Sequence, residues 1–303
     1  FWVVPSVPGD LVSLAGVSAA LATVLIWASF LVTLRFAMTN DFSQGAVLIM
    51  RFLPAAVILA PVIMRTGLRP VGVPTWQLAI IVLGSGVPFY YLISLGLSFS
   101  SASDAGALAP GTLPLLIAVA SFLLLGERFS SFRLIGFGMI LSGGMMIGLW
   151  EAITAGEDGA WQGHILIVTA VCGWALYTVV FRLSGLGALE GAAISIAWSS
   201  IIVVPVGFGL GVSTGNADLY DVLFVLFVQG VLGGAVALVT FGAAVRLLGA
   251  SRTAAFTALT PVIVLISGVV FLGEPMDEVK IAGVLIVSFG VLFASGVIED
   301  RAA

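Results

Sequence analysis

The sequence is poor in charge, histidine and cysteine, and each shortage excludes a class of protein. Charged residues make up 9% of the 303 positions, against roughly a quarter in soluble domains. The chain has one histidine, His164, and one cysteine, Cys172. An internal disulfide is therefore impossible, and we expect neither a metal site nor a cofactor. The basic residues form no stripe, which excludes nucleic-acid binding.

Apolar residues take the place of the missing charge. They make up 60% of the chain, and the mean hydropathy is +1.23. Runs of about 20 apolar residues, the length that crosses a bilayer as a helix, recur throughout. We therefore predict an all-α membrane protein. Its ten spans are expected near 12–34, 44–64, 75–97, 102–124, 132–150, 162–182, 190–211, 220–245, 253–272 and 279–297. Residues 1–9 do not predict a signal peptide, because they lack a basic region.

The second half of the chain repeats the first, 147 positions later. The matched residues are Trp27 and Trp174, Arg35 and Arg182, Gly86 and Gly233, Pro114 and Pro261, Gly126-Glu127 and Gly273-Glu274, Gly136 and Gly283, and Gly143 and Gly290. Each copy holds five spans, an odd number, so the second copy must enter the membrane from the opposite side. We predict two inverted five-helix repeats, residues 1–150 and 151–303, an organisation typical of secondary transporters.

The basic residues predict the orientation. With the N-terminus in the cytoplasm, only Arg35 and Lys280 fall in outer loops, while eight arginines lie on the cytoplasmic side. Those eight are Arg65, Arg69, Arg128, Arg133, Arg182, Arg246, Arg252 and Arg301. Both termini are then cytoplasmic.

The repeated element has a recognisable pattern. A mid-span proline is followed twelve residues later by Gly-Glu, then by a polar turn and a glycine-rich helix, at Pro114 and again at Pro261. With Trp27 and Trp174 in the first spans, the chain resembles the drug/metabolite transporter superfamily, specifically its EamA-like branch. The resemblance implies ten helices around a central path, a bacterial inner-membrane location, and export or exchange of small metabolites, amino acids among them. The second copy departs from the first at Pro275, where the first copy has Arg128.

Prolines in two matched spans are candidate hinges. Pro110 and Pro114 flank Thr112 halfway along the fourth span, and Pro261 follows Thr257 at the same depth of the ninth. Proline within a helix leaves a carbonyl without its donor, which lipid does not tolerate unless protein or a wet cavity satisfies it. We expect these residues to line the substrate cavity and to act as hinges; an ordinary structural kink is the alternative.

Aromatic residues within the spans suggest an apolar pocket with a few polar groups. The candidates are Trp27, Tyr90, Tyr91, Trp174 and Tyr177, together with Gln229 of the eighth span. Trp174 and Tyr177 are three residues apart and share a helix face, and a buried amide usually faces a bundle interior. Simple packing is the alternative. Such a pocket suits an amphipathic substrate better than a phosphate, which would demand several cations.

Charges within the spans are few. Arg51 is a candidate partner for a substrate carboxylate; the alternatives are snorkelling to the interface or an internal ion pair. Asp104 fits a capping box, while Glu127, Glu274 and His164 fall at span edges. No mid-span carboxylate offers a proton relay, so we expect facilitated export or exchange.

The sequence therefore predicts a secondary transporter and no enzyme. We expect it to export small amphipathic metabolites, above all hydrophobic or aromatic amino acids, by alternating access. A multidrug or cationic-compound exporter is the alternative within this class, and a channel for small neutral solutes is the alternative outside it. The expected partners are the small-molecule substrate and the lipid bilayer. Matched glycines should let the fifth and tenth helices pack closely, and the chain should be a monomer or a homodimer.

Overall fold

The protein, seen here as a computed structural model, is described over residues 9–154, 159–248 and 250–296. The regular elements within these ranges are helices. In order they are α1 (Gly9–Thr39), α2 (Gln44–Thr66), α3 (Thr75–Ser85), α4 (Val87–Phe99), α5 (Ala102–Leu108), α6 (Leu113–Leu125), α7 (Ser131–Thr154), α8 (Ala160–Ser184), α9 (Ala188–Gly209), α10 (Leu219–Leu226), the π-helix η1 (Phe227–Val236), α11 (Ala237–Leu248), α12 (Ala250–Thr257), α13 (Thr260–Leu272) and α14 (Glu278–Ala294). The start of the chain to residue 8, the repeat boundary at 155–158, Gly249 and the tail with Arg301 lie outside the described residues.

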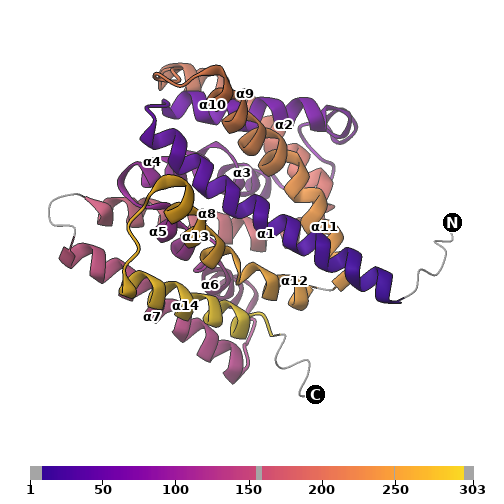
Figure 1. Cartoon of the computed structure of the whole chain (residues 1–303). Coiled ribbons are helices and arrows are strands. Elements are labelled where there is room, and N and C mark those ends of the chain that lie inside the picture. The colour runs from indigo at the N-terminus through magenta and orange to yellow at the C-terminus, as the bar shows by residue number, and fades with distance from the viewer. Residues whose placement is uncertain (1–8, 155–158, 249, 297–303) are drawn as a thin grey trace.

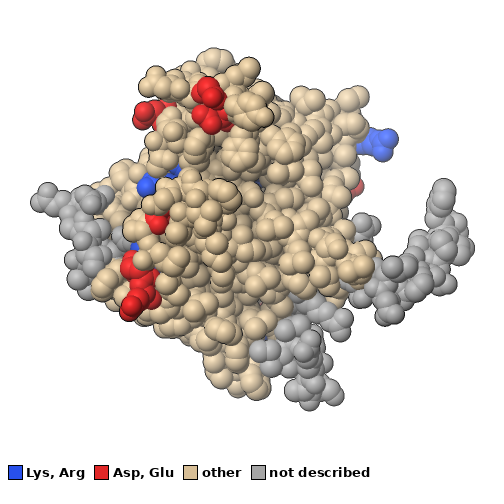
Figure 2. Space-filling model, in the orientation of Figure 1, with Lys and Arg blue, Asp and Glu red and all other residues tan. Residues whose placement is uncertain are grey.

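The helices have the length and composition of membrane spans. Nine stretches of the described chain are long and apolar enough to cross a bilayer, and they coincide with the first nine predicted spans. The last helix, α14, has 17 residues, just under the 18 that such a stretch requires, so the tenth span stays a prediction. Figure 2 shows a face whose broad middle carries no charged side chain. Such a surface suits the hydrocarbon of a bilayer.

The first helices of the two halves, α1 and α8, run in opposite directions. Arg35, near the end of α1, donates a hydrogen bond to the carbonyl of Leu97, near the end of α4. Gly163, near the start of α8, packs so closely on α4 that a methyl group on it would lie 2.6 Å from the Gly96 oxygen. The end of α1 and the start of α8 therefore share one end of the bundle, which supports the inverted repeat. In Figure 1, α1 begins and α14 ends towards the same side of the bundle.

Glycines hold α7 and α14 together. A methyl group on Gly136 would lie 2.7 Å from the Gly290 oxygen, and one on Gly143 would lie 2.8 Å from the Gly283 oxygen. The two backbones are therefore close enough to exclude any side chain larger than hydrogen at these positions. This contact confirms the predicted packing of the fifth helix on the tenth, which lie side by side in Figure 1.

Four of the long spans are irregular near their middles. The fourth breaks between α5 and α6 and the ninth between α12 and α13. Pro114 and Pro261 each lie in the first turn of the half-helix that follows, where the missing proline N–H costs nothing. Both spans are therefore interrupted at the predicted prolines, and each interruption is a break between two half-helices. The third span also breaks, at Gly86, and the eighth widens into η1 around Gly233; neither irregularity was predicted.

Candidate substrate site

Arg51 is a buried cation about two turns into α2. Its side chain is 6% exposed, and Nη1 donates to the Gln229 carbonyl at 2.7 Å while Nη2 donates to the Tyr90 hydroxyl. The guanidinium lies over the rings of Tyr90 and Phe30, 4.2 and 5.2 Å from their centroids. No carboxylate of the described residues lies within 4 Å of it. The Arg51 side chain therefore lies inside the bundle and forms no ion pair with the described residues, and its role as partner of a substrate carboxylate stays a prediction.

The π-helix η1 shapes the wall that Arg51 faces. A π-helix bonds each N–H to a carbonyl five residues back and so has a wider turn than an α-helix. Its glycines admit α2: a Cβ on Gly230 would lie 2.4 Å from the Met50 oxygen, and one on Gly233 would lie 2.2 Å from Arg51 Nη1. Gln229, which is buried, donates its amide to the Phe30 carbonyl. The predicted position of Gln229 in the bundle interior is confirmed.

A run of aromatic rings leads away from Arg51. Tyr90 meets Phe89 edge to face with 4.9 Å between centroids, Phe89 meets Trp174 at 4.6 Å, and Trp174 meets Tyr177 at 5.3 Å. The shared helix face of Trp174 and Tyr177 is thereby confirmed. Four residues singled out in the sequence thus form one connected group with Arg51: Tyr90, Trp174, Tyr177 and Gln229. Within the aromatic run, the contact between Phe89 and Trp174 joins the first half of the chain to the second.

The two other predicted aromatic residues make no ring contact with this run among the described residues. Trp27 stacks on Phe241 of α11, with 5.5 Å between ring centroids. Tyr91 packs against the apolar cluster that contains Phe52 and Tyr90, as Phe89 and Trp174 also do. The structure therefore does not bring Trp27 into contact with the residues around Arg51.

The predicted threonines and prolines flank the two matched breaks. Thr112 donates its hydroxyl to the Leu108 carbonyl at the end of α5, and Thr257 donates to the Ala254 carbonyl in α12 at 2.7 Å. Pro110 lies within the first break, and Pro261 is buried at the start of α13. The hydroxyls thus satisfy carbonyls at the places where helix bonding is interrupted.

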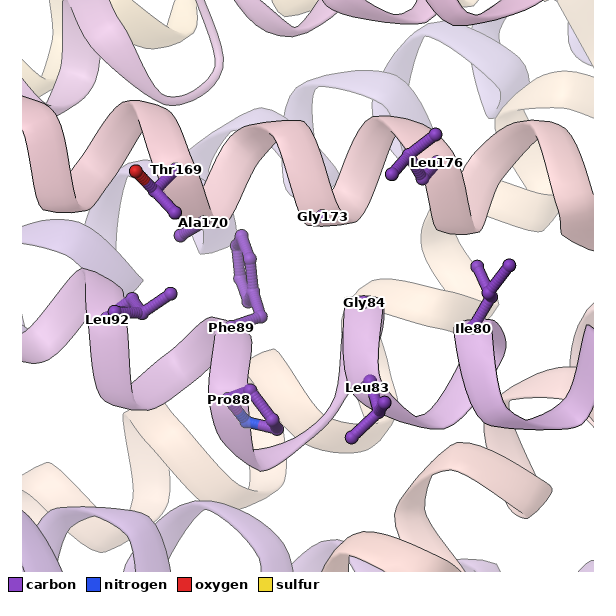
Figure 3. A pocket seen from close by; sticks show the side chains of 10 residues that line it. All are labelled: Ile80, Leu83, Gly84, Pro88, Phe89, Leu92, Thr169, Ala170, Gly173 and Leu176. Carbon is purple, nitrogen blue, oxygen red and sulfur yellow. The ribbon is translucent and has the colours of Figure 1, made fainter. Parts of the chain in front are cut away.

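A shallow hollow of about 220 Å³ lies between α8 and the break at Gly86. Its wall is apolar, and Figure 3 shows Phe89 projecting into it beneath Ala170 and Gly173 of α8. Because Phe89 also touches Trp174, this hollow borders the aromatic run.

A second buried group lies at the end of the bundle where α5 begins. Asp104 forms the predicted capping box with Ser101. Its two carboxylate oxygens also lie 3.5 Å from His164 Nε2 and 3.5 Å from Lys280 Nζ. All three side chains are buried. Sequence reasoning missed this group, since its members are distant in the chain and each one alone falls at a span edge.

Two residues predicted in outer loops are helical instead. Arg35 belongs to α1 and lies 3.6 Å from Glu274, and Lys280 belongs to the first turn of α14. The helix α1 continues to Thr39, beyond the predicted end of the first span near residue 34, and α14 begins at Glu278. The loop assignment of both residues is therefore wrong.

Comparisons with known proteins agree with this architecture. The model of the EamA-like transporter family matches residues 14–149 and again residues 161–296, two segments related by the same 147-residue spacing. The chain is 30% identical over 275 residues to the uncharacterized transporter YyaM of Bacillus subtilis (strain 168), covering 85% of this chain and 86% of that protein. It is 28% identical over 214 residues to the uncharacterized transporter YetK of the same organism, covering 67% and 62%. A solved crystal structure with 19% identity matches 96% of this chain and 98% of its own with a TM-score of 0.62, which shows a shared fold.

Proposed function

The chain belongs to the EamA-like transporter family, and we propose that it exports hydrophobic or aromatic amino acids from the cytoplasm by alternating access. In this proposal ten helices form two inverted five-helix repeats in a bacterial inner membrane, with both termini cytoplasmic. Residues 1–150 and 151–303 are the two repeats. The chain acts as a transporter of a small-molecule substrate and not as an enzyme.

The buried guanidinium of Arg51 is the observation that carries the substrate assignment. A cation inside the bilayer is costly unless it is paired, and its neighbours among the described residues are neutral: two aromatic rings, a hydroxyl and a carbonyl. Its Nε atom has no hydrogen-bond partner there. A substrate carboxylate would supply both the missing charge and the missing acceptor. A lipophilic cation would instead be repelled.

The aromatic run supplies the other half of the recognition. Trp174 and Tyr177 offer ring faces to an apolar side chain. Phe89 contacts both Trp174 and Tyr90, and Tyr90 contacts Arg51. An amino acid with its carboxylate on Arg51 would direct its side chain along this run. Pro110, Pro114 and Pro261 mark the breaks about which the half-helices move in this proposal.

Transport by the purified protein in proteoliposomes tests the assignment. We expect saturable uptake of radiolabelled phenylalanine and leucine, and little uptake of tetraphenylphosphonium or glycerol. Trp174→Ala and Tyr177→Ala should each weaken amino-acid transport by about 1–3 kcal/mol, the value of a lost large apolar contact. Trp161→Ala is the control, because Trp161 lies on the same helix and is 54% exposed.

Each alternative function has its own outcome in this assay. Saturable uptake of tetraphenylphosphonium would favour a cationic-compound exporter, and non-saturating uptake of glycerol would favour a channel. Amino-acid transport that is unchanged in both aromatic variants would remove the basis of the proposed site.

A further inference from the structure

Two ion pairs join the halves of the chain in a reciprocal way. Arg35 of the first half pairs with Glu274 of the second at 3.6 Å, and Arg182 of the second half pairs with Glu127 of the first at 2.9 Å. Arg35 and Arg182 are matched by the 147-residue repeat, and so are Glu127 and Glu274. The same contact between a first helix and the end of a fourth span is therefore built twice, with the halves exchanged.

The two pairs lie at opposite ends of the bundle. Arg35 is near the end of α1, beside the start of α8, whereas Arg182 is near the end of α8. We call these the Glu274 end and the Glu127 end. Each is the place where a substrate path between the repeats would meet one side of the membrane.

The matched pairs differ sharply in burial. At the Glu274 end the arginine and glutamate side chains are 22% and 8% exposed, and at the Glu127 end they are 57% and 35% exposed. The Glu274 carboxylate also accepts the backbone N–H groups of Ala102 and Ser103, at 2.7 and 3.3 Å. The Glu127 carboxylate accepts a hydrogen bond from Arg182 at 2.9 Å.

The helices also pack more tightly at the Glu274 end than at the Glu127 end. At the Glu274 end α5 packs closely on α13, and a Cβ on Gly106 would lie 2.8 Å from Val264. The repeat-related helices α12 and α6 make no comparable contact in the described part of the chain. The two repeat-related sites thus take different conformations in one molecule, and their sequences also differ, because Thr253 stands where the first copy has Gly106.

From this inequality we infer that Glu274 and Glu127 are the clamps of two gates that close in turn. The structure is the state in which the Glu274 gate is closed and the Glu127 gate is open. In the opposite state Glu127 becomes buried at its own end, and Glu274 becomes exposed. The inference rests on the proposed transport function, because gates alternate only in a carrier, but it does not depend on the identity of the substrate.

Because the two gates close in turn, the two glutamates should have opposite effects on the equilibrium between the observed state and the opposite state. Removing the Glu274 charge should destabilise the observed state, in which that carboxylate is buried, accepts two backbone N–H groups and pairs with Arg35. Removing the Glu127 charge should cost this state little, because an exposed pair contributes little. It should destabilise the opposite state, where the pair is buried, and so favour the observed one. A purely structural ion pair predicts no such effect from one end of the molecule on the other.

A cysteine at Ser103 reports on the Glu274 gate. Ser103 is 2% exposed, so Ser103→Cys, with Cys172→Ala to remove the one native thiol, should react slowly with a water-soluble maleimide while that gate is closed. In proteoliposomes without substrate, Glu274→Gln should raise the labelling rate, and Glu127→Gln should lower it, each by about 5-fold or more as coupling between two sites commonly gives. Glu190→Gln is the control, since it removes an exposed carboxylate that has no ion pair among the described residues.

The outcomes separate the gates from the proposed substrate. Opposite shifts by the two variants support alternating gates even if no amino acid is transported, in which case the substrate assignment alone fails. A rate that Glu127→Gln leaves unchanged, or raises, overturns the inference even where amino-acid transport is measured. A folding defect would appear in size-exclusion chromatography of the same variants before reconstitution, and the charge-swapped pair Glu127→Arg with Arg182→Glu then provides the test. Because the swap keeps an ion pair at this end, labelling at the rate of the original pair is expected, and a lower rate would overturn the inference.

Discussion

Replacing Gly233 with alanine should weaken transport by moving Arg51 without removing it. The new methyl group would lie 2.2 Å from Arg51 Nη1. The next nearest atom, the backbone oxygen of Val228, would lie 3.3 Å away. The end of a flexible side chain yields before the backbone does, so the guanidinium should leave the Gln229 carbonyl that it now contacts at 2.7 Å.

The size of the effect follows from the hydrogen bond that the displaced guanidinium would make to a substrate carboxylate. A hydrogen bond from a charged group contributes about 1.5–3 kcal/mol, and its loss corresponds to a roughly 10- to 150-fold higher KM for a carboxylate substrate. The helix propensity that alanine adds, up to about 1 kcal/mol, stabilises the folded protein with or without substrate and leaves KM unchanged. Gly242→Ala is the control, because a methyl group on Gly242 would meet no atom within 4 Å. Equal KM values for the two variants would refute the role of Arg51.

Two further predictions concern packing and orientation. Gly290→Ala places a methyl group 2.8 Å from the Gly136 oxygen, so it should destabilise the protein by about 1–3 kcal/mol. Its melting temperature in detergent should fall, whereas Gly138→Ala, which meets no atom within 4 Å, should leave it unchanged; equal values would reject the glycine contact. Cysteines at the exposed positions Ser131 and Ser213 should label only from the cytoplasmic and only from the outer side of the membrane, respectively, and the reverse pattern would invert the topology.

The helices could be predicted because their signal is local. Each span is a run of apolar residues bounded by polar turns, and the repeat gave the same boundaries twice. The glycine contact between α7 and α14 was equally accessible, since Gly136 and Gly283 recur at matched positions and glycine in membrane helices favours close backbone approach. These features depend on composition and spacing alone.

The irregular spans were harder to predict because glycine is ambiguous. Gly86 and Gly233 are matched by the repeat, yet the first ends a helix and the second lies in a π-helix. A glycine can admit a neighbouring backbone or interrupt a helix, and the sequence does not say which. The prolines were placed at the right depth, but the form of the break depends on what satisfies the freed carbonyls, here the hydroxyls of Thr112 and Thr257.

The contacts of the candidate site could be predicted only in part. Trp174 and Tyr177 share a helix, so their contact follows from spacing. Arg51, Tyr90 and Gln229 come from three different spans, and their meeting depends on helix packing that no local pattern encodes. The pairing of Arg35 with Glu274 had a weak signal, because both residues recur at the repeat spacing, but recurrence does not reveal which partners touch.

The matched gates and the unmatched residues around them together bias which end of the protein is open when no substrate is bound. Two identical inverted halves would make both end states equally stable, so any bias must come from residues that the repeat does not duplicate. Asp104 and His164 are such residues, because their matched positions are Ser251 and Val17. They lie at the Glu274 end, where Lys280 joins them, and we expect this extra buried ionic group to favour the closed state of that gate. In the predicted orientation this end faces outward, so the resting protein is open to the cytoplasm, which is the state in which an exporter must meet its substrate.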